Sequence, residues 1–223
     1  MRQVAFTVAA TIIFLLSLSQ SAFAIGMWEE GRHYKELPLP VKTNNPSKIE
    51  VVEVFWYGCP HCYDFAVKHL PAWEKNLPED VDFVLMPATF NNWKTHAKAY
   101  FAADALGVVD KLHMPLFEAI NPKPKSVNSV DSFKKVFVEN GVSAEDYDAV
   151  FEASGFRKIS KVDEALKKAE EKTRAYRLTG VPGLIVNGKY SIGVSEAGGF
   201  ENMLKIANFL ISKERQKMAS QPK

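Results

Sequence analysis

At one place in this chain, a strand pattern turns into a helix pattern at a pair of cysteines. Residues 49–57 read IEVVEVFWY, and such a run of β-branched and aromatic residues is typical of a buried central strand. Gly58 follows, and from Cys59 onward the apolar residues recur at the spacing of one helix face. The sequence therefore predicts a strand, a tight turn and a helix whose first turn carries Cys59.

Cys59 and Cys62 are the only two cysteines of the chain. A disulfide between them would close a very small loop and restrict the unfolded chain little, so a purely structural role explains them poorly. The start of a helix has unpaired N–H groups and partial positive charge, which lower the pKa of a thiol. Pro60 suits the first helical position, and His61 adds a cationic or N–H-donating ring.

These features predict a redox-active pair rather than a binding site for a metal. A dithiol whose reduced form is stabilised is a strong oxidant. We expect Cys59 to be exposed and to be the attacking sulfur, and Cys62, one turn further in, to be the buried resolving thiol. A zinc site needs four ligands, and covalent haem needs a histidine directly after Cys62, where Tyr63 stands. We expect no metal and no cofactor.

The rest of the chain predicts an α/β fold. Residues 81–86 form a second strand, and several helical segments follow between residues 95 and 180. Asn187-Gly188 separates two short apolar runs, which is a strong signal for a hairpin, and a last helix begins near Phe200. Without the central helices, a β-α-β plus β-β-α unit remains, so we predict a thioredoxin fold with an inserted all-helical subdomain.

The division of the chain begins with a secretory leader. Arg2, an apolar run and Ala22-Phe23-Ala24 predict a signal peptide that is cleaved after Ala24, which places the protein in an exported compartment. We predict thioredoxin-like parts at 25–91 and 169–215, a helical insertion at 92–168 and a polar tail at 216–223. With 28 basic and 26 acidic residues and no long basic run, nucleic acid is not an expected partner.

Glu53 lies in the middle of the predicted central strand. Burial of an unpaired carboxylate is costly, so two interpretations stay open. The side chain faces solvent at the end of a twisted strand, or it is a proton acceptor beneath Cys62.

Several segments resemble the DsbA family of periplasmic disulfide oxidases, and the likeness covers nearly the whole chain after residue 24. The matching segments are Glu53-Val54-Phe55, Cys59-Pro60-His61-Cys62-Tyr63, Leu106-Gly107, Pro115-Leu116-Phe117-Glu118, Gly180-Val181-Pro182 and Val186-Asn187-Gly188-Lys189-Tyr190.

The resemblance implies several properties of the site. It implies that the bond between Val181 and Pro182 is cis, faces the cysteine pair and, with Gly180, pairs with an extended client segment. It also implies that Glu53 is the family's buried glutamate, but Leu85 or Met86 stands where some members place a lysine. The implied partners are folding exported proteins with free thiols and a DsbB-like, quinone-linked membrane protein, and we expect a monomer.

Two other functions stay open on the sequence. The first is a disulfide isomerase or reductase that is kept reduced in the cell. The second is a redox-inert binding protein or chaperone on the same fold, which would work equally well without its cysteines.

Overall fold

A mixed sheet forms the centre of the molecule. The computed structural model describes residues 27–122, 126–153 and 159–220. Within these ranges the sheet has five strands in the order β1-β5-β4-β2-β3. The strands are β1 (Lys35–Glu36), β2 (Ile49–Phe55), β3 (Val81–Pro87), β4 (Gly183–Val186) and β5 (Tyr190–Gly193). The predicted signal peptide lies outside the described residues.

The predicted central strand is the most buried element of the sheet. All seven residues of β2 are buried, and the strand pairs in parallel with β3 and antiparallel with β4. β2 ends at Phe55, two residues earlier than predicted, because Trp56 and Tyr57 belong to the turn that leads into the helix. This turn brings the two cysteines to one end of the sheet.

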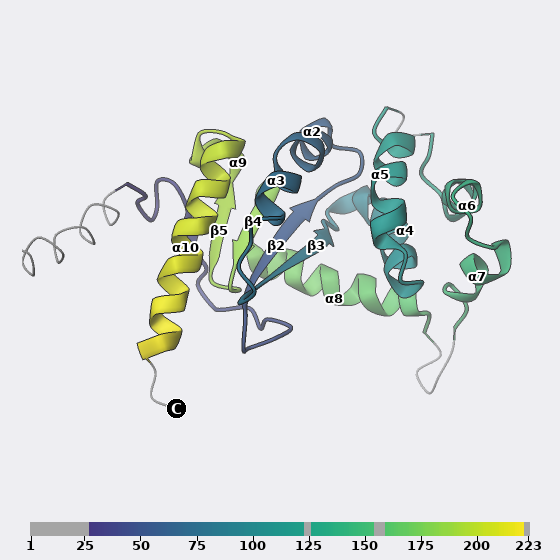
Figure 1. Cartoon of the computed structure of the whole chain (residues 1–223). Helices are drawn as coiled ribbons and strands as arrows, with labels where there is room; N and C mark the ends of the chain where they lie inside the picture. Colours follow the sequence, from purple (N-terminus) through teal and green to yellow (C-terminus); the bar gives the residue numbers. More distant parts are fainter. Residues whose placement is uncertain (1–26, 123–125, 154–158, 221–223) are drawn as a thin grey trace, which may run out of the picture.

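Helices cover both faces of the sheet. On one face lie α2 (Pro60–Lys68), α3 (Leu70–Glu74) and α10 (Phe200–Ser220), which pack around Phe65 and Leu184. On the other face lies α8 (Lys161–Tyr176), which extends from the insertion to beneath the sheet (Figure 1). The short helix α9 (Val194–Ala197) precedes α10. Pro71 interrupts the first helical run, so that α2 and α3 are separate.

The insertion forms a helical layer at one side of the sheet (Figure 1). Its elements are η2 (Asn91–Trp93), α4 (Lys94–Ala105), α5 (Val109–Ile120), α6 (Val130–Glu139) and α7 (Ala144–Ala149). α4 also packs against α8, which runs through the predicted boundary at residue 168. The division of the chain at 92 and 168 therefore stays a prediction, and its second boundary falls inside a helix.

The hairpin prediction is confirmed. Asn187 and Gly188 have φ values of 51° and 61°, as a two-residue hairpin turn requires. A β-carbon on Gly188 would lie 1.9 Å from the carbonyl oxygen of Val41, so only glycine fits there.

The division of the chain at residue 216 stays a prediction: residues 216–220 are exposed, as a polar tail would be, but they belong to a helix. α10 continues to Ser220, and its last turns are tied to distant parts of the chain. Arg215 donates two hydrogen bonds to Asp80, and Lys217 donates one to the Tyr190 hydroxyl. The local composition, which is strongly polar, does not predict these contacts.

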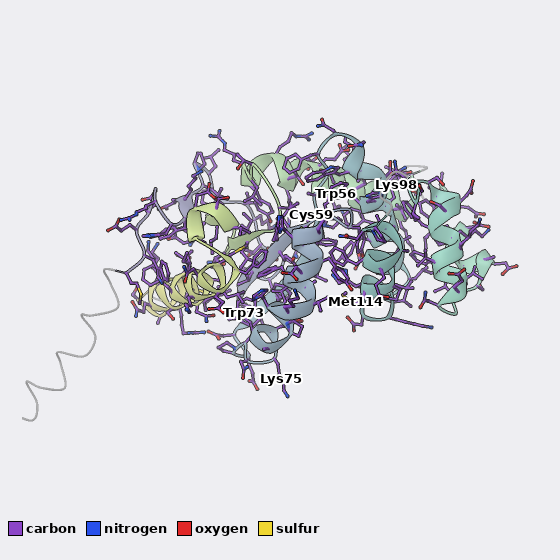
Figure 2. The ribbon with its side chains drawn as sticks, turned by 90° about the horizontal axis from the view of Figure 1, so that it is seen from above. Trp56, Cys59, Trp73, Lys75, Lys98 and Met114 are labelled. Atoms are coloured by element: carbon purple, nitrogen blue, oxygen red, sulfur yellow. The ribbon has the colours of Figure 1, made fainter. Side chains whose placement is uncertain are left out.

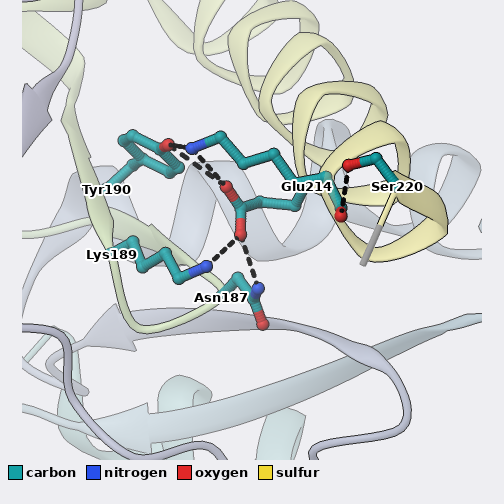
Figure 3. Close-up of polar contacts among 6 residues, drawn as sticks. Asn187, Lys189, Tyr190, Glu214 and Ser220 are labelled. Carbon is teal, nitrogen blue, oxygen red and sulfur yellow. Dashed lines mark hydrogen bonds and ion pairs between the residues drawn. The ribbon is translucent and has the colours of Figure 1, made fainter. Parts of the chain in front are cut away.

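A buried carboxylate fixes α10 to the hairpin. The Glu214 side chain has no exposed surface and accepts hydrogen bonds from Asn187, Lys189 and Tyr190 (Figure 3). Burial by itself would raise the pKa of the Glu214 carboxyl, but these partners and Lys217 outweigh burial and lower the pKa to about 2.

Replacing Glu214 with glutamine should reduce the free energy of unfolding at pH 7 by about 2–3 kcal/mol, because charge-assisted hydrogen bonds are lost. Since the folded pKa lies below the unfolded value of 4.5, this contribution is complete above pH 4.5 and disappears as the pH falls toward 2. Urea unfolding at several pH values measures it. Glu201→Gln on the exposed face of α10 is the control, with an expected change below about 0.5 kcal/mol. Equal effects of the two substitutions would contradict the role of the Glu214 network.

Candidate active site

The cysteine pair lies at the end of β2, where α2 begins. Cys59 is the N-cap of α2 with extended backbone angles, and Pro60 occupies the first turn (Figure 2). The Cys59 carbonyl accepts a hydrogen bond from the Tyr63 N–H, so the helix starts directly at the sulfur-bearing residue. Both cysteines are thiols, so the structure represents the reduced protein.

The two thiols have opposite electrostatic environments. A hydrogen bond from the Cys62 thiol is the largest of the effects that lower the pKa of Cys59 to about 6. Burial opposes it, while the backbone N–H groups of Cys62 and His61 and the charge of His61 lower the pKa further. The pKa of Cys62 is raised well above its usual value, chiefly by burial. At neutral pH this environment favours a Cys59 thiolate next to a Cys62 thiol.

The exposure of Cys59 is smaller than predicted. It is 9% exposed, against 0% for Cys62. The order of exposure agrees with the predicted roles, but both cysteines are buried. The prediction that Cys59 is exposed is therefore wrong.

The loop of residues 180–182 faces the Cys59 sulfur. The Val181–Pro182 peptide bond is cis, as the resemblance implied. The Cys59 Sγ lies 3.7 Å from the Val181 carbonyl oxygen, to which the thiol donates a hydrogen bond. Pro182 is buried, Val181 is half-buried and Gly180 is exposed. The structure thus brings together the two predicted groups of site residues, which are more than 100 positions apart in the sequence.

Glu53 is buried beneath the site. Its side chain has no exposed surface, and neither carboxylate oxygen has a hydrogen-bond partner among the described residues. Burial, and to a smaller extent the charge of Glu74, raise the pKa of Glu53 to about 8. The interpretation that Glu53 faces solvent is wrong. The cross-strand neighbour of Glu53 on β3 is Leu85, so no lysine pairs with it from that position.

The comparisons with known proteins identify this arrangement. The family model described as "DSBA-like thioredoxin domain" matches residues 34–205, which contain the cysteine pair, Glu53 and the Val181–Pro182 loop.

The chain belongs to the DsbA family.

Curated DsbA proteins are similar to this chain over most of their length. The thiol:disulfide interchange protein DsbA of Azotobacter vinelandii is 38% identical over 208 residues, which cover 93% of this chain and 94% of the relative. DsbA of Pseudomonas aeruginosa strain PAO1 is 36% identical over 209 residues and covers 93% of this chain and 96% of its own length.

Solved DsbA structures confirm the predicted fold. A crystal structure of P. aeruginosa DsbA superposes with a TM-score of 0.77 at 37% identity, covering 86% of this chain and 97% of that one. Proteus mirabilis DsbA, in complex with the non-covalently bound peptide PWATCDS, superposes with a TM-score of 0.68 at 29% identity, covering 83% of this chain and 98% of that chain. The protein is therefore a thiol–disulfide oxidoreductase with a thioredoxin fold and a helical insertion.

Two further observations apply to the described part of the chain as a whole. The described residues contain no group of three or more histidine, cysteine or acidic side chains that could hold a metal ion. In the same part of the chain, no helix has the length and apolar character that a membrane span requires.

Trp56 is a part of this DsbA site that the sequence analysis did not single out. Its indole lies over Gly58, where a β-carbon would come within 2.4 Å of the ring, and Figure 2 shows it next to Cys59. The indole N–H donates to His96 in α4 at 2.8 Å, which ties the active-site turn to the helical insertion. The glycine between an aromatic run and the first cysteine is the signal that could have indicated this close approach.

Replacing His61 with serine should raise the pKa of Cys59, but by less than about one unit, because His61 is exposed and its charge lowers that pKa less than the hydrogen bonds to the Cys59 sulfur do. The ultraviolet absorbance of the thiolate, followed during a pH titration, measures the shift. His69→Ser, at the other end of α2, is the matched control and should leave the titration unchanged. An unchanged titration of the His61 variant would remove His61 from the account.

Proposed function

We propose that this thiol–disulfide oxidoreductase works as an oxidase, which donates a Cys59–Cys62 disulfide to folding proteins in the periplasm. The observation that carries this proposal is the contrast between the two thiols. The pKa of Cys59 is lowered to about 6, so the reduced pair is stabilised as a thiolate at neutral pH. When the reduced form of a cysteine pair is stabilised, its reduction potential is more positive, and its disulfide is transferred readily to other thiols.

The transfer takes two exchange steps. A client thiolate attacks the Cys59 sulfur of the oxidised protein, a client–Cys59 disulfide forms, and the Cys59–Cys62 bond breaks. Cys62 leaves as a thiolate and takes up a proton. The protonated carboxyl of Glu53 is the proposed donor, and in the reverse step, when the pair is oxidised again, Glu53 is the proton acceptor that the sequence suggested. A second client thiolate then attacks the client sulfur and releases Cys59 as a thiolate. The client has lost two electrons, and the cysteine pair has gained them.

The client is proposed to bind as an extended segment along the Val181–Pro182 loop. The 3.7 Å contact between the Cys59 Sγ and the Val181 oxygen puts the reactive sulfur beside that backbone. The peptide PWATCDS, which contains one cysteine, is a ligand of the P. mirabilis relative, and this supports a cysteine-containing segment as the client here. We further propose export through the leader of residues 1–24, a monomeric state and reoxidation by a DsbB-like, quinone-linked membrane protein.

The Cys62→Ser variant tests the proposed order of attack. With Cys59 first converted to a mixed disulfide with a small aromatic thiol, the variant should react with an unfolded client that has a single cysteine, release the aromatic thiol and remain covalently bound, because neither Cys62 nor a second client thiol can attack the new disulfide. Non-reducing electrophoresis detects the complex, and a reductant should release it. The Cys59→Ser variant is the control and should form none. Absence of the complex with the Cys62 variant would contradict Cys59 as the attacked sulfur.

A further inference from the structure

An arginine in an unusual backbone conformation lies close to the proposed client site. Arg177 ends α8 with φ = 49° and ψ = 27°, in the left-handed region. Glycine is the usual residue at such a helix end, and another residue there costs about 1–2 kcal/mol. Arg177 is exposed, so its side chain does not repay this cost by packing in the core. A strained residue next to a functional site suggests that its side chain is needed there.

A hollow next to the Val181–Pro182 loop includes Arg177 and Val181, and the carbonyl oxygen of Val181 contacts the Cys59 sulfur. Arg177, Val181 and Pro182 line it together with Lys35 and Glu196. The Lys35 ammonium lies 3.1 Å from the Glu196 carboxylate, so these two charges neutralise each other. Arg177 forms no ion pair with any other described residue, and the hollow therefore has one uncompensated positive charge.

A second hollow adjoins the first and shares Arg177 with it. Arg174, one helical turn earlier on α8, lines this hollow together with Leu39, whose side chain is 77% exposed. Arg174 also forms no ion pair within the described part of the chain, and Glu171 is the acidic residue of this hollow. We call Arg174, Arg177 and Leu39 the arginine surface.

We propose that the arginine surface selects clients that have an acidic side chain two to four residues from the reacting cysteine, with Arg177 as the main contact. The inference rests on the proposed function, since it places the client cysteine at Cys59. Arg177 is four residues from Val181 along the protein chain. An extended client spans about 3.4 Å per residue, so a client that pairs with the Val181–Pro182 loop reaches Arg177 within four of its own residues. A guanidinium group suits a carboxylate because it offers two parallel N–H donors.

The test compares mixed-disulfide formation by synthetic peptides. Each peptide has one cysteine, and each pair differs only by Asp or Asn at two, three or four residues before or after it. The protein is the Cys62→Ser variant with Cys59 activated as above. The Asp peptide should react about three-fold faster than its Asn partner when the substitution lies on one side of the cysteine. In the Arg177→Gln variant this ratio should fall to about one.

Two further variants separate client binding from other roles of Arg177. Arg177→Gly should unfold at a temperature no lower than the parent protein, because glycine adopts this backbone conformation freely, but it should lose the preference for Asp. Lys167→Gln removes an exposed charge from the same helix, about 15 Å away, and should keep the preference.

Three results would overturn the proposal: equal rates for all Asp and Asn peptides, a preference that survives in both Arg177 variants, or an equal loss in the Lys167 variant. If no peptide forms a mixed disulfide with Cys59, the proposed function itself fails. Equal reaction of all peptides leaves the proposed function intact and removes only the selectivity.

Discussion

Replacing Cys59 with serine should abolish disulfide transfer altogether. A serine hydroxyl cannot form the mixed disulfide through which electrons pass, and Cys62 cannot substitute for Cys59. Cys62 has no exposed surface, and burial raises the pKa of its thiol far above neutrality, so it is neither accessible nor ionised. The measurement is the rate at which the oxidised protein introduces disulfides into a reduced model client with two cysteines.

The Cys62→Ser variant is the matched control, because it makes the same chemical change one helical turn away. Neither variant can hold the Cys59–Cys62 disulfide, so both should lack catalytic oxidation, but only the Cys62 variant, activated at Cys59 as above, should form a covalent complex with a client that has a single cysteine. Transfer by the Cys59 variant at a measurable fraction of the wild-type rate would show that Cys62 also acts as an attacked sulfur, and the assignment of roles would be wrong.

Replacing Glu53 with glutamine should make the reduced protein more stable at pH 7, by about 3 kcal/mol. The pKa of Glu53 is about 8 in the folded protein and 4.5 without the protein environment, because burial disfavours the charged form. As the pH rises from 4.5 to 8, the Glu53 carboxyl loses its proton in the unfolded chain but keeps it in the folded protein. The free energy of unfolding therefore falls over this pH range. Glutamine has a similar shape and does not ionise, so the variant lacks this loss.

Chemical denaturation of both reduced proteins between pH 4 and pH 8 measures the difference, which should be near zero at pH 4 and grow with pH. Glu50→Gln, on the same strand, is the matched control. Glu50 is 2% exposed and accepts a hydrogen bond from the Asn44 N–H, so its replacement should not stabilise the protein. A Glu53→Gln variant that is less stable than wild type at pH 7, or a difference independent of pH, would contradict a protonated Glu53.

The sequence was most informative where the chemistry is local. The change from strand to helix period, with a glycine between them, predicts the turn at Cys59, because both patterns depend on neighbouring residues. The hairpin at Asn187-Gly188 follows in the same way from positive φ values that these two residues tolerate. The resemblance to the DsbA family added the Val181–Pro182 loop, which no local pattern places beside the cysteines.

Properties that depend on contacts between distant segments were not predictable. The burial of Glu53 depends on the helices that cover its face of the sheet, and two interpretations of it remained open. The ion pair of Arg215 with Asp80, which is 135 positions away, does not follow from the polar composition of the last helix. The limited exposure of Cys59 was not predicted either, and its thiol contacts the loop at Val181, more than 100 positions further along the chain.

The reduction potential of the Cys59–Cys62 pair, measured by equilibration with glutathione, tests the central claim most directly. We expect a value more positive than about −180 mV, because the start of α2, the Cys62 thiol and His61 stabilise the Cys59 thiolate of the reduced protein. A value near about −270 mV, as in thioredoxin, would contradict it. The fold would stand, but electrons would flow in the opposite direction, and the protein would act as a reductase or isomerase.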